Sequence, residues 1–250
     1  MHMSSTWDWQ VFCKSTAEDT VYPSCFGPGG DTTYFEWLLS AWGWTLSVAV
    51  LAWIVALIAG SLVGIARTAP SKPLVWFGNI WSELFRNVPL LVQIFLWYHV
   101  LPQLIPALRI VPSFMLVVFA LGFFTSARVA EQVRAGIMAI PKGQRYAGLA
   151  MGFTTAETYR YVLLPRAFRI VIPPLTSEAM SIIKNSSVAF AVGIAELTLF
   201  AMQSQEETSR GIEMYLAVTG LYFASAFLVN RIALVIERRA AVPGMAGAGQ

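Results

Sequence analysis

The sequence predicts an all-α integral membrane protein with five transmembrane helices and one long cytoplasmic loop. Of its 250 residues, 56% are hydrophobic and only 12% are charged, whereas a typical soluble domain carries about 25% charged residues. The mean hydropathy is +0.61, and the abundance of Trp and Phe also excludes a disordered chain. Because a spanning helix takes about 20 apolar residues, the length gives room for roughly five to seven spans.

Five apolar runs, bounded by proline or charged residues, are the expected spans. The second is entered through an amphipathic stretch, and the fourth is less apolar than the others. We therefore expect a leader over residues 1–40, a membrane domain over 41–239 and a flexible tail over 240–250. The apolar runs cover residues 44–66, 90–108, 114–140, 172–200 and 215–236.

The distribution of Lys and Arg predicts the orientation of these spans. If the helices alternate in direction, only Lys14, Arg109 and Arg210 fall on the side of the N-terminus. The positive-inside rule then places the N-terminus outside, and both the loop 141–169 and the C-terminus in the cytoplasm. The basic residues on the cytoplasmic side are Arg67, Lys72, Arg86, Arg134, Lys142, Arg145, Arg160, Arg166, Arg169, Arg238 and Arg239.

The leader holds both cysteines of the chain, Cys13 and Cys25. It lacks the basic and apolar segments of a cleavable signal peptide, so the first span is expected to direct insertion. Two alternatives stay open for the cysteines: a short disulfide loop in an oxidising compartment, or two free thiols. Two cysteines without companion ligands predict no metal site.

The cytoplasmic loop contains signals for two short helices. The stretch 142–151 is a helical candidate that ends at Gly152, a natural C-terminal cap. Thr154 and Glu157 form a capping-box pattern that begins a second helix, which Pro165 is expected to end. Such a pair fits docking into a groove on another protein. Binding to lipid headgroups would explain the charges but not the Gly and Pro positions.

The same loop resembles the EAA loop of ABC importer permeases. The family pattern is Glu-Ala-Ala, three residues, Gly, nine residues, Ile, one residue, Leu-Pro, and the chain reproduces its spacing from Gly152 onward. It departs from the pattern with Tyr146 at the Glu position and Gly148 at the second Ala. The resemblance implies a coupling helix seated in a cleft of an ATP-binding subunit. The residues implied in coupling are Ala147, Gly148, Gly152, Val162, Leu164 and Pro165.

Three further stretches are similar to polar amino-acid permeases of the histidine/glutamine type: ELFRNVPLLVQ at 83–93, ARVAEQVRAG at 127–136 and IKNSSV at 183–188. Within that type they most resemble permeases of glutamate/aspartate import systems. The resemblance implies a type I importer in the bacterial inner membrane, with a second permease subunit that is an identical copy or a related chain. It also implies two ATPase subunits that bind ATP and Mg, and an extracytoplasmic substrate-binding protein. No cofactor in this chain and no nucleic-acid partner are expected.

Polar residues inside the spans are the candidates for a substrate pathway: Arg128, Glu131, Lys184, Asn185 and Gln93. A charge at a helix centre costs about 2.5 to 3.5 kcal/mol by insertion scales, so it needs a role or a partner. Arg128 offers a bidentate fork to the side-chain carboxylate of an acidic amino acid. Its alternatives are pairing with Glu131 or snorkelling toward the cytoplasm. Lys184 and Asn185 either line the pathway or bond between helices.

The sequence contains no GxxxxGK[ST], HExxH or GxSxG motif, which excludes ATP hydrolysis and the common hydrolase sites for this chain. We therefore predict a non-enzymatic transmembrane subunit of an ABC importer for polar amino acids, with glutamate and aspartate as the expected substrates. The rival hypothesis is a secondary transporter or channel that works without ATPases. An inverted repeat would favour the rival, and the sequence shows none.

Overall fold

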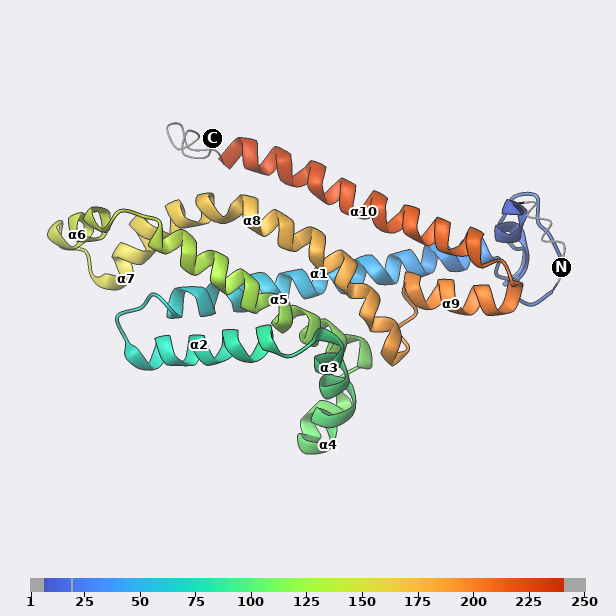
Figure 1. The fold of residues 1–250 in the computed structure, drawn as a ribbon, viewed down its shortest axis with the longest axis horizontal. Coiled ribbons are helices and arrows are strands. Elements are labelled where there is room, and N and C mark those ends of the chain that lie inside the picture. Colours follow the sequence, from blue (N-terminus) through green and yellow to red (C-terminus); the bar gives the residue numbers. More distant parts are fainter. Residues whose placement is uncertain (1–6, 19, 241–250) are drawn as a thin grey trace. The chain divides into compact units, whose positions relative to one another are not determined.

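The computed structural model describes residues 7–18 and 20–240, so the predicted tail lies outside the described residues from 241 onward. The regular elements of this part of the chain are helices, with two isolated β-bridges in the leader (Figure 1). The α-helices are α1 (Tyr34–Ala66), α2 (Lys72–Asn87), α3 (Leu90–Phe95), α4 (Leu101–Leu104), α5 (Ser113–Met138), α6 (Lys142–Ala150), α7 (Thr155–Glu157), α8 (Leu164–Asn185), α9 (Leu197–Thr208) and α10 (Gly211–Ala240).

The chain divides into two compact units. Unit 1 contains residues 1–49 and 183–226, and unit 2 contains residues 50–182 and 227–250. Helices α1, α8 and α10 each contribute residues to both units. The leader therefore belongs to unit 1 and the cytoplasmic loop to unit 2.

Among the described residues, three helices are long and apolar enough to cross a membrane, namely α1, α5 and α10. Two bent helix pairs bring the number to five if each pair is one span. In the first, α2 meets residues 90–104 at 105°, and in the second, residues 155–192 meet α9 at 52°. The prediction of an all-helical membrane protein with five spans is confirmed in this form.

The second predicted span, the apolar run 90–108, is not one straight helix: residues 90–104 pass the span test together with α2, as a bent pair. The chain bends sharply between α2 and α3, and α3 and α4 turn away from α2 (Figure 1). Proline causes the breaks, because Pro89, Pro102 and Pro106 lack the N–H that a continuous helix requires. Gln93 Nε2 donates hydrogen bonds to two carbonyl oxygens near the bend, those of Phe85 and Val88, both at 2.9 Å.

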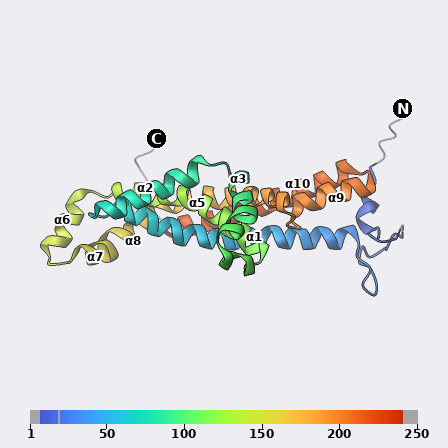
Figure 2. The same cartoon turned by 90° about the horizontal axis from the view of Figure 1, so that it is seen from below.

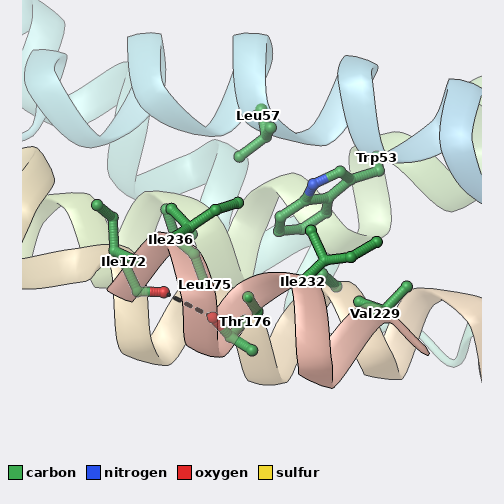
Figure 3. A pocket seen from close by; sticks show the side chains of 10 residues that line it. Trp53, Leu57, Ile172, Leu175, Thr176, Val229, Ile232 and Ile236 are labelled. Atoms are coloured by element: carbon green, nitrogen blue, oxygen red, sulfur yellow. Dashed lines mark hydrogen bonds between the residues drawn. The ribbon is translucent and has the colours of Figure 1, made fainter. Parts of the chain in front are cut away.

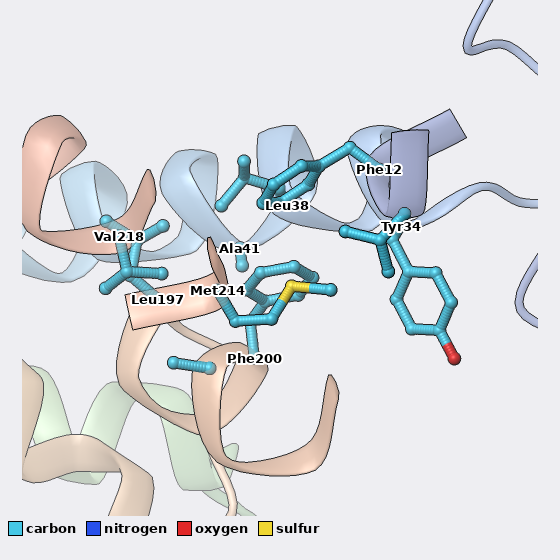
Figure 4. Packing of buried hydrophobic residues seen from close by; sticks show 10 residues of the cluster. Phe12, Tyr34, Leu38, Ala41, Leu197, Phe200, Met214 and Val218 are labelled. Atoms are coloured by element: carbon cyan, nitrogen blue, oxygen red, sulfur yellow. The ribbon is translucent and has the colours of Figure 1, made fainter. Parts of the chain in front are cut away.

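The leader is folded onto the helix ends of unit 1. A disulfide joins Cys13 to Cys25. The Asp31 carboxylate accepts hydrogen bonds from Tyr22 Oη (2.6 Å) and Ser15 Oγ (2.7 Å), and these bonds lower the pKa of that carboxyl group. Figure 4 shows Phe12 of the leader in one apolar cluster with side chains of α1, α9 and α10. The buried members of the cluster are Val11, Phe12, Tyr34, Leu38, Ala41, Leu197, Phe200, Ala201, Met214 and Val218.

Unit 2 is built around α5, most of which is buried. Glycines on α1 let its backbone approach α5 closely: a Cβ added at Gly60 would lie 2.5 Å from Val129 Cβ, and one at Gly64 would lie 2.8 Å from Val133 Cβ. Close backbone contact through small residues is a common source of helix association in membranes. Figures 1 and 2 place α6 and α7 at the same end of unit 2 as the connection between α1 and α2.

Candidate functional site

Helix α6 ends in a glycine-dependent cap, as the sequence predicts. Gly152 has φ +88°, in the left-handed region that glycine adopts without steric cost. The Phe153 N–H donates to the Gly148 carbonyl at 3.2 Å, and the Gly152 N–H donates to the Leu149 carbonyl at 3.0 Å. These two bonds form a Schellman motif. The chain consequently turns sharply at Gly152, and α6 and α7 form a hairpin, residues 142–163, which we call the coupling hairpin.

The second helix of the coupling hairpin begins at the predicted capping box. Thr154 Oγ1 accepts from the Glu157 N–H at 3.2 Å, and Glu157 Oε2 accepts from the Thr154 N–H at 2.8 Å. The prediction that Pro165 ends this helix is wrong, because α7 continues through a π-helical segment, Thr158–Leu163, directly into α8. The Leu164 N–H bonds to the carbonyl five residues earlier. This wider turn lets the backbone continue past a proline, which has no N–H and clashes with the α-helical i−4 carbonyl.

The coupling hairpin is anchored to the helix bundle of unit 2. Tyr159 Oη donates to the Thr68 carbonyl at 2.5 Å, which joins the hairpin to the connection between α1 and α2. Tyr159 is also buried in an apolar cluster with the last turn of α5. A Cβ added at Gly148 would lie 3.0 Å from Thr158 Cγ2. That tight fit explains why glycine stands where the EAA pattern has its second alanine.

The outer face of the coupling hairpin exposes large side chains. Tyr146, Met151 and Tyr161 are 63%, 69% and 61% exposed. The Arg160 guanidinium lies over the Tyr161 ring, 5.6 Å from its centroid. Exposed aromatic and Met side chains beside Arg are typical of protein interfaces. Of the predicted coupling residues, Ala147, Gly152 and Pro165 are exposed, whereas Gly148 is buried and Val162 and Leu164 are partly buried against unit 2.

An ion network lies at the α1, α2 and α5 contact of unit 2. Arg67 Nη1 lies 2.8 Å from Glu131 Oε1, and the Arg67 side chain is only 7% exposed. Arg67 also donates to Asn79 Oδ1 at 2.9 Å and to Ser82 Oγ at 3.0 Å. Glu131 has two further cationic neighbours, Arg86 at 3.6 Å and Arg134 at 3.7 Å. The Glu131 carboxylate is therefore neutralised by Arg67, Arg86 and Arg134.

The predicted alternative in which Arg128 pairs with Glu131 is wrong. Arg128 Nη1 faces Glu178 Oε2 of α8 at 3.7 Å, and its guanidinium lies over the Phe124 ring at 5.2 Å from the centroid. Glu131 lies on α5, the same helix as Arg128, but its carboxylate is already neutralised by Arg67. The Glu178 carboxylate of α8 is the one that faces Arg128. The Arg128 side chain is 43% exposed in the described chain.

Of the other predicted pathway residues, Gln93 belongs to unit 2, as Arg128 does, whereas Lys184 and Asn185 belong to unit 1. Gln93 is buried at the α2–α3 bend. Lys184 is exposed and has no hydrogen-bond or ion-pair partner among residues 7–18 and 20–240.

An apolar cavity of about 330 Å³ lies in unit 2 between α1, α8 and α10 (Figure 3). Trp53, Ile172, Leu175, Ile232 and Ile236 dominate its lining. Thr176 Oγ1 is already hydrogen-bonded to the Ile172 carbonyl at 3.1 Å and to Glu237 Oε1 at 2.9 Å. The cavity offers hydrocarbon rather than partners for charged groups, so it is a poor site for a polar solute.

Residues 54–242 match a family model described as "Binding-protein-dependent transport system inner membrane component". The chain belongs to this family. It is thus a multi-pass permease subunit of an ABC importer in the bacterial inner membrane, and the predicted family and subunit type are confirmed. Transporters of this family depend on a binding protein and on separate ATPase subunits.

Relatives place the permease among amino-acid importers. It is 38% identical to the glutamate/aspartate import permease GltJ of Escherichia coli K12 over 98% of this chain and 99% of GltJ. It is 35% identical to the glutamine transport permease GlnP of the same organism, over 78% of this chain and 89% of GlnP.

Two solved structures share the permease fold. The crystal structure of an amino acid ABC transporter with histidines superposes with a TM-score of 0.72 at 32% identity, covering 82% of this chain and 95% of the other. The inward-facing MetNI methionine transporter gives a TM-score of 0.70 at 21% identity, covering 82% and 96%, and supports the fold alone.

Sequence reasoning missed Glu196 of the permease. Its side chain is fully buried, and it caps α9 by accepting from the Thr198 N–H (2.8 Å) and the Leu199 N–H (3.0 Å). Tyr222 Oη donates to the same carboxylate at 2.7 Å. The available signal was Gly193 three residues before an acidic residue inside an apolar run, which is the pattern of a helix end followed by a new N-cap.

Removing the Tyr159 hydroxyl should loosen the coupling hairpin. In Tyr159→Phe the Thr68 carbonyl loses a hydrogen bond worth about 1 kcal/mol, so local opening becomes about fivefold more frequent. Hydrogen exchange followed by mass spectrometry should show faster exchange over residues 142–163. Tyr161→Phe is the matched control, because Tyr161 is exposed. Equal exchange in both variants would contradict the anchoring role.

Proposed function

We propose that this permease subunit imports glutamate and aspartate. The observation that carries the proposal is the 38% identity to GltJ, which extends over 98% of this chain. GltJ is named for glutamate/aspartate import. The matched part of the glutamine permease GlnP covers only 78% of this chain. The whole-length match supports the acidic amino acids over other polar ones.

Arg128 supports the same substrate class. Its guanidinium is partly exposed on α5, within a membrane span, and carries a positive charge that an acidic side chain can neutralise. Arginine binds a carboxylate through two parallel hydrogen bonds, which a neutral amide matches less well. The role of Arg128 is thus to admit the extra carboxylate of glutamate or aspartate.

The proposed assembly places this chain beside a second permease subunit, either a copy or a related chain. Two ATPase subunits, which bind the ATP and Mg, dock on the coupling hairpin through the residues of its exposed face. An extracytoplasmic binding protein delivers the substrate on the side of the leader, with the N-terminus periplasmic and the C-terminus cytoplasmic, as the basic residues indicate. ATPase closure then moves the paired spans between inward-open and outward-open states.

Uptake by the complete importer in proteoliposomes tests this function. Labelled aspartate and glutamate should accumulate only when the binding protein and ATP are both present, and unlabelled glutamine in excess should compete weakly. Accumulation driven by an ion gradient without ATP, or transport of glutamine alone, would refute the proposal.

Aspartate uptake by the Arg128→Tyr variant should fall at least about tenfold, since the side-chain carboxylate of the substrate then lacks its cationic partner in the membrane. Arg128→Lys should retain part of the activity because it keeps the charge without the planar fork. Arg231→Tyr is the matched control, because Arg231 also lies over a ring, that of Phe227 at 4.8 Å, on another helix of unit 2. Unchanged aspartate uptake in Arg128→Tyr would remove Arg128 from the pathway.

A further inference from the structure

Two of the Arg–Glu pairs in unit 2 differ strongly in distance and exposure. Arg67 meets Glu131 at 2.8 Å, is almost completely buried, and has hydrogen-bond acceptors on α2 as well. Arg128 and Glu178 approach only to 3.7 Å, and the arginine side chain is 43% exposed. An Arg–carboxylate pair at full strength has two N–H···O contacts of about 2.7 to 2.9 Å. The Arg128–Glu178 pair is therefore too long for a direct hydrogen bond.

Glu178 is the less satisfied member of the Arg128–Glu178 pair. Its side chain is only 16% exposed, and its buried Oε2 atom has no hydrogen-bond partner among the described residues. Buried carboxylate oxygens are normally hydrogen-bonded, because an unpaired one keeps most of its desolvation cost. The only positive charge that the structure pairs with Glu178 in the described chain is Arg128.

We propose that the Glu178 carboxylate competes with the substrate for the Arg128 guanidinium: it faces Arg128 between transport events, and the acidic amino acid takes its place during transport. This inference rests on the proposed function, in which Arg128 receives the substrate carboxylate. A permanently open guanidinium in a membrane span would hold an anionic substrate too tightly. Return of Glu178 to Arg128 offsets that attraction and speeds release. Glu178 is thus a positioning residue that sets how strongly the pathway retains its substrate.

Equilibrium binding of L-aspartate to the purified complex of permease and ATPase subunits, without the binding protein, tests the inference. Glu178→Gln and Glu178→Ala both remove the competitor, so the Kd for aspartate should fall about three- to tenfold. The maximal aspartate uptake rate in proteoliposomes should fall as well, because release is slower. Glu178→Asp keeps the charge and should restore both values toward those of the unmodified complex. Binding of neutral L-glutamine should not change.

Tighter binding is the result that distinguishes a competitor, because loss of a merely structural residue would not tighten aspartate binding. Weaker or unchanged aspartate binding in both Glu178→Gln and Glu178→Ala would therefore overturn the inference. In the double variant Arg128→Gln with Glu178→Gln, the gain should disappear. The proposed function fails separately, when the unmodified importer does not take up aspartate or glutamate. If uptake occurs and depends on Arg128 but the Glu178 variants bind no tighter, only the role of Glu178 is refuted.

Discussion

Replacing Gly152 by aspartate is expected to lower ATP-driven uptake by at least about tenfold while the permease remains inserted in the membrane. Gly152 has φ +88° and forms the exposed turn of the coupling hairpin. Aspartate tolerates a left-handed backbone better than most residues, so the fold should survive at a cost of about 1 to 2 kcal/mol. The new carboxylate, however, lies on the face that we propose to enter the ATPase cleft, where an unpaired charge is costly.

Two variants separate docking from backbone strain. Gly152→Asn has nearly the same shape and backbone tolerance without the charge, and should retain more activity. Gly29→Asp introduces the same side chain at another glycine with positive φ, +66°, in the leader, and should leave uptake unchanged. The measurement is ATPase co-purification together with aspartate uptake. If both survive in Gly152→Asp, the hairpin does not dock as proposed.

The structure of this turn could be predicted from the sequence because its signals are local. Gly152 and the Thr154–Glu157 capping box lie within a stretch of six residues, and the structure contains both. Pro165 gave the wrong prediction because a helix can continue past a proline when the turn before it is widened, and the π-helical segment Thr158–Leu163 supplies such a turn. Capping signals within a few residues therefore predicted the helix ends at Gly152 and Thr154, but they did not predict the π-helical segment before Pro165.

Charge pairing was harder to predict for a related reason. The sequence places Glu131 three residues after Arg128, which favours a pair along one helix. In the structure Arg67, 64 residues earlier, reaches that carboxylate instead. The partner of a charge inside a bundle is set by which helices pack together, and single-sequence periodicity does not carry that information. The sequence therefore predicted that Arg128 and Glu131 belong to the third apolar run, but not which residues they pair with.

Removing the Glu131 carboxylate should destabilise the permease more than any other single ion-pair change in the network. In Glu131→Ala the Arg67 charge stays buried without its counter-ion, and loss of one partner of a buried pair costs about 3 to 5 kcal/mol. Because Glu131 is 30% exposed, we expect the lower end of that range. The thermal midpoint of the detergent-solubilised protein should fall by about 5 to 10 °C.

Glu83→Ala is the matched control, since Glu83 pairs with Arg86 at 2.7 Å but is 56% exposed. Exposed pairs contribute at most about 1 kcal/mol, so its midpoint should change little. A double-mutant cycle then identifies the partner of Glu131: coupling should exceed about 1 kcal/mol with Arg67 and be close to zero with Arg128. The reverse result would restore the Arg128–Glu131 pair, and would leave Arg128 with no guanidinium available for a substrate carboxylate.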